Sequence, residues 1–233
     1  MDNLTSEERN FARFPLTYRE AMDMLNEHGY PLFYGPMNPT LFGIRTNDNY
    51  TNGFTDVLGV LWNENGMNKI ITVRGTTKPG LYGDGAITAP KKIHGITGTA
   101  VMVPGHYRGL WRMENFDYFG HENTNLKCPK IQSFNPWWYP FLHQVGACKL
   151  YRDGNMDSLI SKEIVTDSLT DGINCHYMGN DITPNTYLDD NLNNWSLGCQ
   201  GAPANELVRI FEVLYRTIPH YGRTLSYSLM ELV

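Results

Sequence analysis

Residues 54–77 read FTDVLGVLWNENGMNKIITVRGTT, and this stretch decides the fold class. Apolar residues are dense from Val57 to Trp62 and again from Lys69 to Arg74, and the polar sequence Asn-Glu-Asn-Gly separates the two runs. Asn-Gly is a favoured dipeptide in the tight turn of a β-hairpin, where both central residues need a positive φ. The stretch therefore predicts two antiparallel strands joined by a short turn.

The rest of the chain supports a mainly β protein with a few short helices (α+β). Its 233 residues include 12% aromatic residues, 22 Gly and 13 Pro but only 18% charged residues, a composition that favours strands and turns over helical bundles. One helix is predicted over residues 17–31, because Thr17 and Glu20 are spaced as in a capping box and Gly29 stops the run. A second is predicted over residues 202–222. We expect residues 1–39 to form a helical segment packed on one domain of residues 40–233.

Charge and hydropathy limit the classes of partner. The formal net charge is −5 and no basic stretch is long enough to neutralise several phosphates, so a nucleic-acid partner is not expected. The first ten residues, MDNLTSEERN, lack an apolar segment, which predicts synthesis in the cytoplasm without a signal peptide. No run approaches the roughly 20 apolar residues of a membrane span. The glycine-rich residues 75–86, GTTKPGLYGDGA, lack the end of a phosphate-binding loop, so they predict a loop beside a substrate groove and no cofactor.

Residues 172–200, GINCHYMGNDITPNTYLDDNLNNWSLGCQ, carry the candidate chemistry. His176 follows a strand-like run, and Cys199 lies in a turn of small residues. A cysteine becomes a nucleophile when a neighbouring histidine favours its thiolate. Gly198 should let the chain approach a substrate closely, and the consecutive amides of Leu197, Gly198 and Cys199 are candidate donors to an oxyanion. Cys175 should point away from His176, since successive side chains of a strand face opposite sides.

The order of these residues resembles the catalytic domain of the L,D-transpeptidase family, whose motif runs His-Gly-Ser/Thr, a loop, then Ser/Thr-His-Gly-Cys. The blocks TVRGTTKPG, VPGHYRGLWRM, QVGACKLYRDGN and GINCH…WSLGCQ, in this order, resemble a phage and bacterial branch of that family. The resemblance implies a β-sandwich or barrel, with Cys199 as nucleophile, His176 as base, Ser196 shaping the turn and Gly198 donating to the oxyanion. It also implies a peptidoglycan stem peptide as substrate, attacked at the cell wall after release of the enzyme or from within a virion.

The sequence also departs from the family motif. Leu197 stands in place of the second histidine, Tyr177 and Met178 replace the residues after the first, and Gln200 replaces the apolar residue that precedes an arginine. These departures keep a second hypothesis open, a virion structural or wall-binding protein with a decayed active site, whose partners are other virion proteins or the wall.

Cysteine and histidine also raise the question of metal. His176 and Cys199 could bind zinc with one more of His94, His106, His121 or His143, since thiolate and imidazole suit that ion. Their spacing matches no compact zinc motif, so we expect no metal. Cys128 and Cys148 form no Cys-x-x-Cys pair and are expected to be small buried side chains.

Overall fold

The hairpin predicted from residues 54–77 is present in the computed structural model. Strand β2 (Asp56–Glu64) pairs antiparallel with β3 (Met67–Gly75), in a register that runs from Asp56 opposite Gly75 to Glu64 opposite Met67. Asn65 and Gly66 have φ values of 55° and 77°, the positive values that a tight two-residue hairpin turn requires. The structure describes residues 15–47, 53–78, 99–117, 138–153, 162, 165–169, 172–178, 196 and 198–232.

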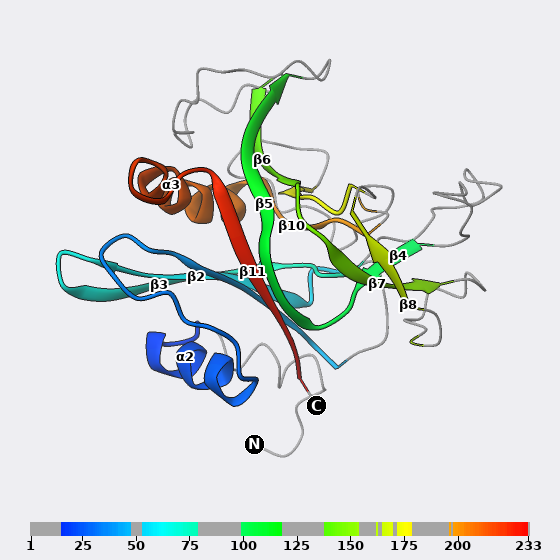
Figure 1. Ribbon diagram of the computed structural model, residues 1–233, viewed down its shortest axis with the longest axis horizontal. Helices are drawn as coiled ribbons and strands as arrows, with labels where there is room; N and C mark the ends of the chain where they lie inside the picture. Colours follow the sequence, from blue (N-terminus) through cyan, green and yellow to red (C-terminus); the bar gives the residue numbers. More distant parts are fainter. Residues whose placement is uncertain are drawn as a thin grey trace.

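Six further strands extend this hairpin into an eight-stranded sheet of order β10-β9-β6-β5-β11-β1-β2-β3 (Figure 1). They are β1 (Thr40–Arg45), β5 (Gly105–Asp117), β6 (Trp138–Gln144), β9 (Cys175–Tyr177), β10 (Gln200–Ala202) and β11 (Thr224–Glu231). Neighbouring strands pair antiparallel except for β1 with β11 and β9 with β10, which are parallel. A separate three-stranded sheet contains β4 (Thr99–Met102), β7 (Cys148–Asp153) and β8 (Val165–Ser168).

The two edges of the large sheet meet at Thr76 and Gly201. The Thr76 amide donates to the Gly201 carbonyl at 2.7 Å, and the Gly201 amide donates to the Thr76 carbonyl at 3.0 Å. This bridge joins the end of β3 to β10, so the sheet is nearly closed and resembles a barrel. Closure pairs edge groups that would otherwise be open to another chain. The prediction of a mainly β fold is confirmed.

Helix α3 (Ala204–Tyr221) packs on the inner face of the sheet. Its side chains Leu207, Phe211 and Leu214 are at most 1% exposed and share one hydrophobic cluster with Trp111 and Leu142 of the strands. Fully burying such a side chain contributes about 1.5–3 kcal/mol. The sequence predicts that Ile218, Pro219 and Gly222 end this helix. Gly222, at a φ of 77°, does follow its last residue, whereas Ile218 and Pro219 lie within its last turn.

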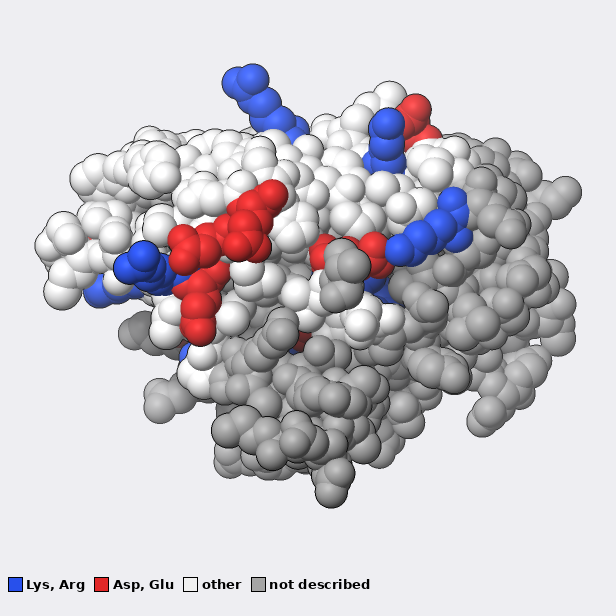
Figure 2. Space-filling view, turned by 90° about the horizontal axis from the view of Figure 1, so that it is seen from below, with Lys and Arg blue, Asp and Glu red and all other residues white. Residues whose placement is uncertain are grey.

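Helix α2 (Tyr18–Glu27) packs on the opposite face of β2 and β3 from α3 (Figure 1). Ala21 and Leu25 are fully buried against a second cluster that includes Phe42 and Leu61. Thr17 caps the helix, and the predicted capping box with Glu20 is present. Acidic side chains gather on the side of the molecule where α2 lies, as Figure 2 shows, while the basic side chains there are dispersed. Neither of the helices in the described chain is long and apolar enough to cross a membrane.

Candidate functional site

The parallel strands β9 and β10 bring His176 and Cys199 side by side. Gln200 is in register with Cys175 and Gly201 with His176, and the Gln200 amide donates to the Asn174 carbonyl at 2.8 Å. Cys199, the residue before β10, therefore lies next to the start of β9. A side-chain hydrogen bond joins Cys199 to His176, and both side chains are partly buried. Although 22 positions separate them in the sequence, the two residues form one pair in space.

Two glycines allow this approach. A Cβ atom at position 201 would lie 2.1 Å from the His176 carbonyl oxygen, so any side chain there would push β9 away from β10. A Cβ atom at position 198 would lie 2.6 Å from the carbonyl oxygen of Ala100 in β4, and Gly198 has a φ of 145°, which L side chains rarely adopt. The sequence predicted that Gly198 lets the chain approach a substrate. In the structure its close contact is with Ala100 in β4 of the same chain.

The surroundings of Cys199 favour its thiolate. Burial raises the pKa of the thiol. The hydrogen bond and the charge of His176, together with the backbone amides of Asn174 and Cys199, lower it by more than burial raises it, so the pKa lies below its ordinary value. In its protonated form the thiol donates to the Gly172 carbonyl at 3.3 Å. A lowered pKa and partial exposure are the two properties that a reactive cysteine needs.

The surroundings of His176 favour its cation. Burial lowers its pKa, but the hydrogen bond and charge of Cys199 and the carbonyl of Tyr177 raise it above the ordinary value. The Nδ1 atom lies 2.7 Å from that carbonyl oxygen, which can only accept, so Nδ1 carries a hydrogen. Nε2 is therefore the ring nitrogen that can take the thiol proton. The two pKa shifts are complementary, because each charged form stabilises the other.

Ser196 holds the turn that carries the cysteine. Its hydroxyl donates to the Cys199 carbonyl at 2.7 Å and accepts from the Gly198 amide at 3.1 Å. The Gly198 amide, predicted to face an oxyanion, is thus bonded within the turn. The backbone amides of Cys199 and Asn174 both act on the Cys199 sulfur and lower its pKa. The sequence did not indicate the role of the Asn174 amide, because only the pairing of β9 with β10 brings Asn174 close to Cys199. Leu197 lies outside the described residues.

Other cysteines and histidines of the described chain do not join this pair. Cys175 faces the core, as predicted, and burial raises the pKa of its thiol. Cys148 is also buried, whereas Cys128 lies outside the described residues. No three His, Cys, Asp or Glu residues of the described chain form a group that could hold a metal ion. His106 and His143 therefore do not complete a zinc site with His176 and Cys199, and His94 and His121 lie outside the described residues.

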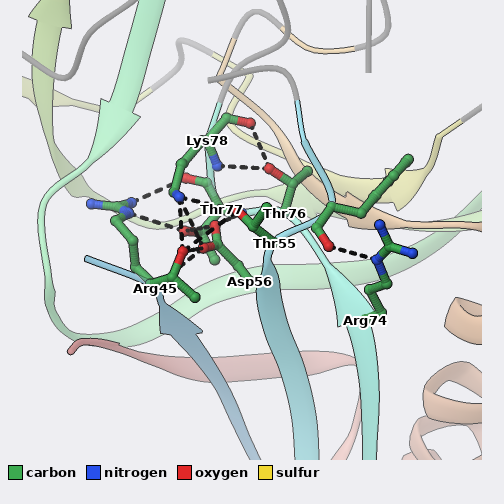
Figure 3. Close-up of polar contacts among 9 residues, drawn as sticks. Arg45, Thr55, Asp56, Arg74, Thr76, Thr77 and Lys78 are labelled. Atoms are coloured by element: carbon green, nitrogen blue, oxygen red, sulfur yellow. Dashed lines mark hydrogen bonds and ion pairs between the residues drawn. The ribbon is translucent and has the colours of Figure 1, made fainter. Parts of the chain in front are cut away.

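A buried polar network lies at the end of β3, next to the Thr76–Gly201 bridge that closes the sheet (Figure 3). Asp56, which is 1% exposed, accepts from the amide and the hydroxyl of Thr77 at 2.8 and 2.7 Å and contacts Lys78 Nζ at 3.3 Å. Arg45 donates to the Thr77 hydroxyl and carbonyl, both at 3.0 Å. These bonds fix the residues that follow Thr76, whose backbone pairs with Gly201. Of the glycine-rich loop predicted over residues 75–86, residues 79–86 lie outside the described chain.

Comparison with protein-family models, with curated proteins and with solved structures gives no match.

Proposed function

We propose that this chain is a peptidoglycan-processing cysteine enzyme that acts on stem peptides through an acyl-enzyme. The observation that carries the proposal is the parallel pairing of β9 with β10, which places Cys199 beside His176, so that the interaction of the two side chains lowers the thiol pKa and raises the imidazole pKa. The pair supports cysteine acyl chemistry. The choice of substrate rests on the resemblance of the ordered sequence blocks to the L,D-transpeptidase family. The proposal that the nearly closed sheet is a fold of that family rests on the same resemblance.

The proposed reaction has two halves. His176 Nε2 takes the Cys199 proton, and the thiolate attacks a carbonyl carbon of the stem peptide. The tetrahedral intermediate collapses as the C–N bond breaks, the leaving amine takes the proton from His176, and a thioester remains. An amine or a water molecule then attacks the thioester while His176 takes its proton, and the Cys199 thiolate leaves. An amine gives a new cross-link, and water gives cleavage.

Access to the wall follows from the same proposal. An enzyme of this kind would reach peptidoglycan after release from the cell or as part of a virion. Its partners are then the stem peptide and, in the second case, other virion proteins.

Purified sacculi provide the test, with mass spectrometry of the muropeptides before and after incubation. Wild-type protein should change the cross-links or the stem-peptide length, whereas Cys199→Ala and His176→Ala should leave the muropeptides unchanged. Cys175→Ala is the matched control, because it removes the neighbouring thiol that faces the core, and it should keep activity. Activity in folded Cys199→Ala would overturn the mechanism.

A structural or wall-binding role is the second candidate. It is favoured by the Gly198 amide, which is bonded to Ser196 and so is not directed at an oxyanion. This role predicts that the wild-type protein sediments with sacculi without changing any muropeptide, and that Cys199 reacts with iodoacetamide no faster than an ordinary cysteine near neutral pH.

A further inference from the structure

The segment Gly172 to Asn174 contacts Cys199 through the peptide groups on both sides of Ile173. The Gly172 carbonyl accepts from the thiol at 3.3 Å. Burial raises the pKa of the Cys199 thiol, whereas His176 and, to a smaller extent, the backbone amide of Asn174 lower it. The position of this segment therefore acts directly on the protonation of Cys199.

Ile173, between these two peptide groups, is held from both sides by side chains of other strands. Its amide donates to Gln144 Oε1 at 2.8 Å, and its carbonyl accepts from Trp111 Nε1 at 2.7 Å. The backbone amide of Gln144 also donates to Asn174 Oδ1 at 2.9 Å. Gln144 is 5% exposed and Trp111 is fully buried, so water does not compete for these bonds.

The carboxamide of Gln144 has only one orientation that satisfies its neighbours. Its Nε2 lies 3.1 Å from the Gly146 carbonyl and 3.3 Å from the Ser168 carbonyl, and carbonyl oxygens only accept. Nε2 must therefore face these two carbonyls, which leaves Oε1 for the Ile173 amide. A glutamate would place an oxygen against both carbonyls, so the site requires an amide.

We infer that Gln144 is a positioning residue for the Cys199 nucleophile. It does not touch the sulfur. It links the end of β6 and the β8 strand to Ile173, and it thereby holds the Asn174 amide at the position where that amide stabilises the thiolate. This inference rests on the proposed function in taking Cys199 as the nucleophile, and it adds a residue that acts on reactivity from the core side of the sheet.

Loss of the Gln144 carboxamide should make the thiolate less stable. Hydrogen bonds to a charged group are stronger than those between neutral groups, so even partial loss of the Asn174 contact should lower the thiolate population about tenfold below its pKa, which corresponds to about 1.4 kcal/mol. The Gly172 contact acts in the opposite sense by favouring the thiol, but a thiol is a weak donor, so its loss compensates little.

The test measures the pH dependence of iodoacetamide alkylation at Cys199, with peptide mass spectrometry to assign the modified residue. Gln144→Met keeps the side-chain length and removes both polar groups. It should shift the profile to higher pH and slow alkylation about tenfold at pH values below the wild-type midpoint. Gln144→Asn, a second variant that keeps an amide but cannot span the same gap, should shift the profile in the same direction and covers the case in which Gln144→Met does not fold.

Thr40→Val is the matched control: like the Gln144 variants, it removes a buried side-chain oxygen that accepts from a backbone amide, but it does so away from the site. Thr40 is 2% exposed and accepts from the Phe33 amide at 2.9 Å, on β1 and not on the strands of the site. Its variant should lose stability and keep the wild-type alkylation profile. A Gln144→Met or Gln144→Asn protein that is folded and alkylates like wild type overturns the positioning role alone. A wild-type profile equal to that of free cysteine overturns the proposed function, and the positioning role with it.

Discussion

Replacement of Asp56 by asparagine tests the buried network beside the barrel closure. The Asp56 carboxylate accepts from the Thr46 amide at 2.9 Å and from the Thr77 amide at 2.8 Å, and it contacts Lys78 at 3.3 Å. The side chains of Asp56 and Lys78 are both 0% exposed, and Arg45 is fully buried beside them. Two buried cations thus lie beside one buried carboxylate, and the substitution removes its negative charge.

The expected loss of stability in Asp56→Asn follows from the burial of the ion pair. Removing one partner of a buried ion pair typically costs about 3–5 kcal/mol, because the remaining charge keeps its desolvation cost without its attraction. Asparagine also places an NH₂ group where a carboxylate oxygen accepted from two donors. For a domain of this size, 1 kcal/mol lowers Tm by about 2–4 °C, so Asp56→Asn should lower Tm by roughly 6–20 °C. Lys78→Met in the same chain should recover part of this loss, since it removes the buried cation whose ion pair with Asp56 is lost.

Urea unfolding at pH 7 measures the effect as a change in midpoint with m unchanged. Glu206→Gln is the control, because it makes the same carboxylate-to-amide change in an exposed pair with Arg209 on α3, where about 0–1 kcal/mol is expected. Asp56 and Lys78 are not a coupled buried pair if Asp56→Asn lowers the free energy of unfolding by less than about 1 kcal/mol. The same conclusion follows if the double variant with Lys78→Met loses the full sum of the two single losses.

The site and the core supply the remaining predictions. Because the pKa of Cys199 is lowered, its alkylation rate should rise with pH and reach half its maximum at a pH below about 8.5, the pKa of a free cysteine. His176→Ala should move that midpoint to higher pH when the alkylation rate is measured over a series of pH values. Turnover should fall again as pH rises through the raised His176 pKa, since the amine leaving group needs the imidazolium proton, and a midpoint for this limb at or below about 6.5 would contradict it. Gly201→Ala should abolish turnover of sacculi through the 2.1 Å contact with the His176 carbonyl, and full activity would show that β9 and β10 need not approach so closely. Leu25→Ala should cost about 2–5 kcal/mol in urea unfolding and leave alkylation of Cys199 unchanged, because α2 packs on the opposite face of the sheet from the core that supports the site.

Local signals in the sequence were sufficient for several elements. The Asn65-Gly66 turn set the β2–β3 hairpin, because only residues that accept a positive φ fit there, and the Thr17 and Glu20 pair marked the start of α2. Alternation along β9 correctly separated Cys175 from His176, since a strand turns successive side chains to opposite faces. Each of these depends on residues within a few positions of one another.

The sequence by itself thus determined the fold class, the presence of the two helices, the cap of α2 and the residue types from which a cysteine site could be built. Only the tertiary structure decided that β9 and β10 pair in parallel, that the Gly198 amide serves the Ser196 turn, and that Gln144 holds the segment beside Cys199. The physical reason is that these contacts join strands far apart in the chain, whose register depends on the closed sheet as a whole. No local pattern in a single sequence encodes which buried amide will face which sulfur.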